Sequence, residues 1–291
     1  MAPNQFEYQA PQDIEEAVRL LQQNDQARLL AGGHELIPQI KLGRIAPPLL
    51  IDLRHIPELR GITHKAGESH LSIGAMVTCN ELASNAAVQA DCEALVEAAK
   101  SIGDAQVRNR TTIGGNLAGG DPAADLAAAV LVLEAVLHVV GPYGPREIDA
   151  EQFLVGPYST DLQAGEIIKE VIFPVGAERR ASTYEKIKIP ANSYPLCGVA
   201  AAVTMTEKKG VESCRVALTG AAAHPIRLFD VEAGLTGGNP TPKKIAAAAK
   251  KANEGLTCVS DLFASAEYRA GLVPVLTERA LTRAVDRAQQ R

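Results

Sequence analysis

Two short segments that each contain a pair of glycines could bind a phosphate anion. The first reads Ala31-Gly32-Gly33-His34-Glu35-Leu36, and the second reads Thr111-Thr112-Ile113-Gly114-Gly115-Asn116. Glycine tolerates positive φ angles and has no Cβ, so several backbone N–H groups can approach one anion. A dinucleotide pyrophosphate is therefore a ligand that such turns can hold. Neither segment has the spacing of a Rossmann or P-loop motif, and either turn alone is also compatible with a simple chain reversal.

The elements around the first turn are predicted from hydrophobic spacing. Residues 12–23 are expected to form a helix, because Ile14, Ala17, Val18 and Leu21 recur on one helical face. Residues 27–31 indicate a strand that stops at the glycines, residues 36–42 a helix, and residues 49–53 a second strand. The first turn therefore lies in a strand, turn, helix, strand unit.

The second turn lies between two predicted helices. The first covers residues 86–100. The second should begin at Asp121 and Pro122, which suit an N-cap and a first helical position, and run on through Glu134. A strand is expected at residues 166–173, followed by a linker at residues 174–180.

The rest of the chain predicts a second, smaller domain. Strands are expected at residues 184–189, 198–205 and 214–218, and helices at residues 241–253 and 273–287. This order favours an α+β domain of three strands followed by helices. A length of 291 residues is also typical of two domains.

Composition excludes several classes of partner. With 46% hydrophobic and 22% charged residues the chain should fold as a globular protein. The net charge is −5 and no basic run is present, so no nucleic-acid binding is expected. The most apolar run, residues 126–140, contains Glu134 and His138 and is shorter than the roughly 20 residues of a membrane span. No basic and apolar leader opens the sequence, which favours the cytoplasm.

The five cysteines are scattered and form no CxxC pair. They are Cys79, Cys92, Cys197, Cys214 and Cys258. Local spacing therefore builds neither a zinc site nor an iron–sulfur cluster. We expect buried thiols that act as small hydrophobes, with a redox or modification site as the alternative.

The combination of motifs resembles one family closely. The string GDAQVRNRTTIGGNLA at residues 103–118, followed by DPAAD at residues 121–125, resembles the FAD-binding medium subunits of molybdenum hydroxylases. These are the flavoprotein subunits of the carbon-monoxide dehydrogenase and xanthine dehydrogenase group. The string AGGHELIP at residues 31–38 resembles the same subunits, and the similarity extends over essentially the whole chain, including IDL at 51–53 and IPEL at 56–59.

The resemblance implies an α+β fold of the vanillyl-alcohol-oxidase type. Residues 1–177 would form an FAD-binding domain of two α+β subdomains, and residues 178–291 a C-terminal domain with a three-stranded sheet and helices. In the family both glycine loops lie against the pyrophosphate. Carried over by position, the cofactor-binding residues are Gly32, Gly33, His34, Glu35, Leu36, Ile102, Gly103, Thr111, Thr112, Ile113, Gly114, Gly115, Asn116, Asp125 and Tyr194.

Some of these positions have particular implied roles. Ile102 and Gly103 match a segment near the flavin, and Asp125 matches an acid that hydrogen-bonds the cofactor. Tyr194 lies in a stretch that in similar proteins reaches back to the isoalloxazine ring, where an aromatic side chain can stack or act as a gate. Simple packing at the domain junction is the alternative for Tyr194.

Two positions depart from the family pattern. Glu35 stands where serine is common, and an ionised carboxylate near a pyrophosphate would repel it unless the side chain points away. Thr111 stands where glycine is frequent, which leaves open whether that position needs a positive φ. His34 could attach flavin covalently, as in some proteins of the fold, but a positioning role is expected. Arg108 and Arg110 are assigned no catalytic role.

The implied function is that of an electron-transfer subunit. A large molybdopterin subunit would oxidise the substrate, a small subunit would pass electrons through [2Fe-2S] clusters, and FAD in this chain would deliver them to a terminal acceptor. The assembly would be a dimer of heterotrimers. A self-sufficient flavin oxidoreductase of the same fold and a flavin-free assembly scaffold are the alternatives. The sequence identifies neither the organic substrate nor the acceptor among oxygen, NAD and quinone.

Overall fold

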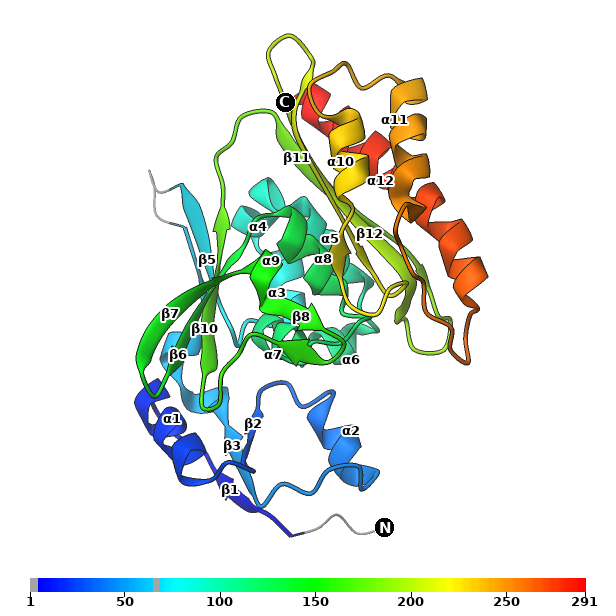
Figure 1. Cartoon of the computed structure of the whole chain (residues 1–291). Coiled ribbons are helices and arrows are strands. Elements are labelled where there is room, and N and C mark those ends of the chain that lie inside the picture. Colours follow the sequence, from blue (N-terminus) through cyan, green and yellow to red (C-terminus); the bar gives the residue numbers. More distant parts are fainter. Residues whose placement is uncertain (1–4, 65–68) are drawn as a thin grey trace.

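Four β-sheets organise the part of the chain that the computed structural model describes, residues 5–64 and 69–291. Figure 1 shows two of these sheets separated by a group of helices, with a small sheet near the N-terminus below them. The elements of the first 174 residues come before the C-terminal sheet in sequence and pack against one of its faces.

The N-terminal sheet is parallel, with strand order β1-β3-β2. Its strands and helices are β1 (Glu7–Gln9), α1 (Ile14–Gln23), β2 (Arg28–Leu30), α2 (Leu36–Lys41) and β3 (Leu49–Asp52). Helix α1 begins after Asp13, whose side chain accepts a hydrogen bond from the Glu16 N–H. The predicted strand, turn, helix, strand unit is confirmed within two residues at each boundary.

The second sheet is antiparallel and places strands that are distant in sequence side by side. Its order is β4 (Ile62–Thr63), β5 (His70–Gly74), β10 (Ile167–Pro174), β6 (Val136–Gly141) and β7 (Gly144–Asp149). The helices of this region are η1 (Leu53–His55), η2 (Pro57–Leu59), α3 (Cys79–Ser84), α4 (Ala86–Asp91), α5 (Glu93–Ser101), α6 (Ala105–Arg108), α7 (Ile113–Ala118), α8 (Asp125–Val132) and α9 (Ala150–Phe153). A short hairpin of β8 (Leu154–Gly156) and β9 (Ser159–Thr160) follows α9.

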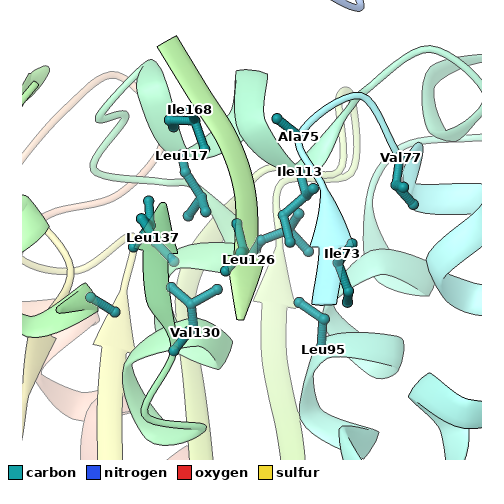
Figure 2. Packing of buried hydrophobic residues seen from close by; sticks show 14 of the residues in the cluster. Ile73, Ala75, Val77, Leu95, Ile113, Leu117, Leu126, Val130, Leu137 and Ile168 are labelled. Atoms are coloured by element: carbon teal, nitrogen blue, oxygen red, sulfur yellow. The ribbon is translucent and has the colours of Figure 1, made fainter. Parts of the chain in front are cut away.

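Helix α8 is buried along its whole length and forms the centre of the larger hydrophobic core. Figure 2 shows Leu126 and Val130 of α8 among side chains from α5, α7 and the second sheet, including Leu95, Leu117 and Leu137. Helix α8 also packs against β12 and β13 of the C-terminal sheet. The residues of α8 after Asp125 are all apolar, which is expected only where neighbours cover every face of a helix.

Two helix predictions and one turn prediction in this part of the chain need correction. The helix expected to begin at Asp121 begins at Asp125 and ends at Val132, because the Pro122 carbonyl is bonded by the Gly220 N–H and the Thr219 hydroxyl at 2.8 and 3.0 Å. Asp121 instead forms a turn by accepting from the Ala123 N–H at 2.8 Å.

The other two corrections concern residues 86–100 and the second glycine segment. The single helix expected at 86–100 is broken into α4 and α5 at Cys92, whose φ and ψ of −125° and 50° are not helical. The second glycine segment is not an open turn, because Gly114 and Gly115 lie in the first turn of α7, which Thr112 caps.

The C-terminal sheet is antiparallel with the order β11 (Arg180–Lys188), β12 (Pro195–Met205), β13 (Val211–Thr219) and β14 (Ile226–Arg227). The three long strands are those predicted, and β14 adds two residues at one edge. The helices are α10 (Phe229–Leu235), α11 (Pro242–Ala249), η3 (Lys250–Asn253) and α12 (Ala266–Gln290). Helix α12 begins seven residues before the predicted start, because Ser265 caps it, and it continues through Pro274.

A second hydrophobic cluster lies between this sheet and its helices. We propose a domain boundary between residues 177 and 178, supported by the connection between β10 and β11 at residues 175–179 and by the second cluster, whose members all follow residue 180. Cys79, Cys92, Cys197 and Cys214 are buried as predicted, whereas Cys258 is partly exposed. Within residues 5–64 and 69–291, no helix is long and apolar enough to cross a bilayer.

Candidate cofactor site

The first glycine loop connects β2 to α2 and touches the segment that leads into the second loop. A Cβ built on Gly32 would lie 1.9 Å from the carbonyl oxygen of Arg110, which no side chain can accommodate. Gly33 adopts a φ of 78°, in the region that favours glycine. Both glycines are therefore required for the chain path itself, before any ligand is considered.

The second loop is fastened to the end of β5. The Gly114 N–H donates to the Ala75 carbonyl at 2.9 Å, and a Cβ on Gly114 would lie 2.6 Å from the Cβ of Ala75. Thr112 Oγ1 accepts from the Gly115 N–H at 3.2 Å. Gly114 is thus required by packing, while Gly115 is exposed.

A cavity of about 470 Å³ lies where these loops meet the C-terminal domain. Its walls include both loops, the turn after α5, the turn before α8 and the connection between β11 and β12. The predicted site residues that border it are Gly32, His34, Glu35, Ile102, Gly103, Thr111, Thr112, Gly115, Asn116, Asp125 and Tyr194.

Four predicted site residues do not border this cavity. Gly33 packs beside Leu30 and Ile37, and Ile113 is fully buried in the core, as Figure 2 shows. Leu36 and Gly114 border a second cavity instead.

The second cavity measures about 790 Å³ and lies on the other side of the loops. Apolar side chains dominate part of its wall, including Leu29, Leu36 and Leu162. Glu35 and Gly115 border both cavities. The two hollows therefore meet at the two glycine loops.

A buried polar network holds Asp125, which borders the cavity on the side of the C-terminal domain. Asp125 is 6% exposed, and its Oδ1 accepts from the Tyr184 hydroxyl at 2.7 Å and from Lys186 Nζ at 2.8 Å. Lys186 Nζ also donates to the Ser193 carbonyl at 2.8 Å. Burial raises the pKa of Asp125, against the opposing effect of the Lys186 ammonium, and burial lowers the pKa of Lys186.

Sequence reasoning missed Tyr184 and Lys186, which hold Asp125 at the cavity without bordering it themselves. They are two positions apart on β11 and so share one face of the strand. A polar pair on the inward face of a strand was the available signal. Their partner lies about 60 positions earlier, so the pattern could not identify it.

Tyr194 is held at the cavity mouth by a tight turn. The Ser193 N–H donates to the Ile189 carbonyl at 2.9 Å, and Ser193 has a φ of 62°. The side chain of Tyr194 is 46% exposed while bordering the cavity. Partial burial raises the pKa of its hydroxyl to about 12, and the carboxylates of Asp121 and Glu35 add to this effect.

Glu35 directs its carboxylate toward the end of α7. Its Oε1 accepts from Gln39 Nε2 at 3.2 Å, and a Cβ on Gly119 would lie 2.4 Å from its Oε2. Partial burial raises the pKa of this carboxyl, and Asp121 raises it further. Glu35 therefore lies between the two cavities rather than facing away from both.

The other uncertain positions have plain structural explanations. Thr111 is not among the described residues with a positive φ, so the position does not require glycine. Arg108 Nη1 donates to the carbonyls of Ile102 and Gly103 at 3.1 and 3.4 Å and thereby fixes the turn after α5. His34 and Arg110 are exposed.

Comparison with known proteins covers the whole chain. Residues 4–176 match the family described as the FAD binding domain in molybdopterin dehydrogenase, and residues 182–284 match the CO dehydrogenase flavoprotein C-terminal domain. The carbon monoxide dehydrogenase medium chain of Hydrogenophaga pseudoflava is 39% identical over 98% of both chains. The glyceraldehyde dehydrogenase medium chain of Sulfolobus acidocaldarius is 32% identical over 96% of this chain and 98% of its own.

A solved structure matches at the level of the fold. It is the carbon monoxide dehydrogenase from Hydrogenophaga pseudoflava that lacks the Mo-pyranopterin moiety of the molybdenum cofactor, with a TM-score of 0.94 and 40% identity over 99% of each chain. The described elements are therefore arranged as in that protein.

Proposed function

The chain belongs to the family of FAD-binding medium subunits of molybdenum-containing dehydrogenases, and from this premise we propose that it relays electrons through a bound FAD. Electrons would arrive from the [2Fe-2S] clusters of a small partner subunit and leave to a terminal acceptor. The observation that carries the proposal is the pair of cavities that meet at the two glycine loops.

The residues present fit FAD. The second cavity, with Leu29, Leu36 and Leu162, suits an adenine ring, and the first suits the ribityl chain and isoalloxazine ring. Gly115, common to both, would border the pyrophosphate. Among the described residues Asn116 Oδ1 has no hydrogen-bond partner although it is buried, so it offers an acceptor to a cofactor hydroxyl or N–H.

The chain's side chains would position the cofactor rather than oxidise a substrate. When bound, FAD supplies the electron transfer itself. Lys186 and Tyr184 hold the Asp125 carboxylate in place, and Asp125 and Tyr194 border the cavity. Across residues 5–64 and 69–291, no group of three or more His, Cys, Asp or Glu is arranged to hold a metal ion.

We propose cofactor contact for the predicted site residues that border either cavity. Gly33 and Ile113 would act indirectly, by fixing the loop conformation and by anchoring α7 in the core. Non-covalent binding is proposed, with His34 in a positioning role. Lys186 joins the proposed site.

The proposed partners are a small iron–sulfur subunit and a large molybdopterin subunit, assembled as a dimer of heterotrimers in the cytoplasm. The word "medium" in the names of the relatives supports partners of two other sizes. Those relatives are named for carbon monoxide and for glyceraldehyde, although each is more than 30% identical to this chain over nearly its full length. Because such similar medium chains occur in enzymes named for different substrates, we infer that another subunit selects the substrate.

Purification of the chain from its source with its bound partners tests the proposal. We expect a small iron-containing chain and a large molybdenum-containing chain, and we expect the substrate of the complex to bleach the flavin absorbance only when both are present. A lone chain that oxidises an organic substrate would establish the self-sufficient flavin oxidoreductase instead. A complex that contains this chain but no flavin would favour the scaffold.

A further inference from the structure

Two carboxyl groups border the first cavity, and the charge of one of them, Asp121, raises the pKa of the other, Glu35. Glu35 borders both cavities and Asp121 borders the first. Glu35 Oε2 lies so close to Gly119 that a Cβ there would be 2.4 Å away, and Asp121 is two residues further along this turn. Each carboxylate raises the energy of charging its neighbour, because like charges at short range repel.

Within residues 5–64 and 69–291 neither Glu35 nor Asp121 forms an ion pair with a described side chain. Their hydrogen-bond donors are Gln39 Nε2 for Glu35 and the Ala123 N–H for Asp121. Lys186 is already paired with Asp125.

The other titratable groups around the pair are mainly acids, phenols or an exposed imidazole. On the first cavity they are His34, Asp104, Asp125 and Tyr194, and Tyr158 of the β8–β9 hairpin responds to both carboxylates through a raised pKa. On the second cavity they are Asp25, Arg28 and Glu166. Arg28 Nη1 donates to the Ala27 carbonyl at 2.9 Å, and Glu166 is paired with Arg146.

The local environment already favours the protonated forms. Partial burial raises the pKa of both Glu35 and Asp121 in the free chain. A ligand that fills the cavities would remove water from the carboxylates, and a pyrophosphate beside Gly115 would add negative charge. Both effects raise the pKa of the pair further.

We propose that FAD binding at this junction takes up a proton on Glu35 or Asp121, so that the chain holds FAD less tightly as pH rises. The proposal rests on the function proposed above. Because the pKa of the pair is higher in the complex than in the free chain, affinity is greatest below both values. Between the pKa of the free chain and the higher pKa of the complex, the Kd for FAD rises by up to about tenfold per pH unit. Above the higher pKa the Kd levels off.

The test is an FAD titration of the full apoprotein, followed by quenching of flavin fluorescence from about pH 5.5 to about pH 9. The variants are Glu35→Gln and the double variant Glu35→Gln/Asp121→Asn, which keep the acceptors used by Gln39 and Ala123. Glu15→Gln, at an exposed position in the first turn of α1, is the matched control for the loss of one negative charge. Circular dichroism and thermal unfolding check that each variant is folded.

We expect the Kd of the wild type and of Glu15→Gln to rise with pH and that of the double variant to stay flat, with about tenfold tighter binding than wild type near the top of the range. Calorimetry in two buffers of different ionisation enthalpy should show net proton uptake by the wild type only. A wild-type Kd that is independent of pH, or an equal pH slope in the double variant, would overturn the proton uptake while leaving FAD binding intact. No FAD binding at any pH would overturn both proposals.

Discussion

The two walls of the first cavity are built in different ways. On the FAD-binding side, two backbone segments approach closely, because Gly32 lies against the Arg110 carbonyl. On the C-terminal side, long side chains from β11 and its following turn reach across, and Lys186 and Tyr184 bond Asp125. The first wall fixes the shape of the site, and the second fixes its charge.

The difference predicts different tolerance to substitution. A wall formed by close backbone approach accepts no added atom, because the nearest neighbour cannot move without the chain moving. A wall formed by side chains depends on burial, so a change at buried Lys186 should matter and a change at half-exposed Tyr194 should not alter stability.

The largest effect is expected for Gly32→Ala. The new Cβ would lie 1.9 Å from the Arg110 carbonyl oxygen, so the two loops must separate. We expect a loss of about 3 kcal/mol or more in the free energy of unfolding, together with loss of FAD retention on gel filtration. The matched control is Gly271→Ala in α12, where a Cβ meets no atom within 4 Å and should stabilise the helix slightly. Full flavin retention by Gly32→Ala would contradict the account of this wall.

The next effect is expected for Lys186→Met, which leaves Asp125 buried without its cation. We expect a loss of about 3 kcal/mol in unfolding free energy near pH 8, compared with little change for exposed Lys188→Met. Because burial raises the folded-state pKa of Asp125, the variant should be stable at low pH and lose stability as pH rises through that pKa. Urea denaturation at several pH values measures this. A loss that does not depend on pH would point to packing instead of charge.

A smaller effect is expected for Glu97→Gln, which weakens the contact that holds the C-terminal wall against α5. Glu97 Oε1 accepts from Arg283 and Arg287, each at 2.6 Å, and Oε2 accepts from the Tyr184 N–H at 2.8 Å. Since both arginines are partly exposed, the loss should be only about 1 kcal/mol and should shrink at high salt. Denaturation midpoints at low and high salt test this, and equal losses in both would exclude an electrostatic origin.

The smallest effect on stability is expected for Tyr194→Ala, within about 0.5 kcal/mol. FAD content should stay unchanged, because the glycine loops remain, but the rate of flavin reoxidation in the assembled complex should change. Tyr194→Phe separates the hydroxyl from the ring, and Tyr143→Ala, at a fully exposed hairpin tip, is the control. If Tyr194→Ala and the wild type show the same flavin reoxidation rate with each of oxygen, NAD and a quinone, Tyr194 has a packing role alone.

Local patterns predicted those elements whose ends are set by nearby residues. Helix α1 begins beside its cap at Asp13, and the strands of the C-terminal sheet follow runs of buried residues. Helix α8 was placed wrongly because its start is decided by bonds from Thr219 and Gly220 to Pro122, which are distant in sequence. Asp121 and Pro122 begin a turn rather than the predicted helix.

The site residues also divide into those that local motifs predict and those that depend on contacts between distant segments. Resemblance predicted Asp125 and the glycine motifs predicted both loops, and these border the two cavities. Lys186 was missed because its partner is 61 positions away, and the contact between Gly32 and Arg110 joins segments that no local pattern connects. Contacts between distant segments are fixed by packing of the whole fold, and sequence periodicity carries no information about them.

Flavin content tests the central claim most directly. The full chain is purified, saturated with FAD, freed of excess cofactor and precipitated with acid, and flavin is measured in the supernatant and in the pellet. We predict one FAD per chain, all of it in the supernatant, as expected for non-covalent binding between the glycine loops and the C-terminal wall. A chain that retains no FAD, or a flavin that stays with the precipitated polypeptide, would contradict the account.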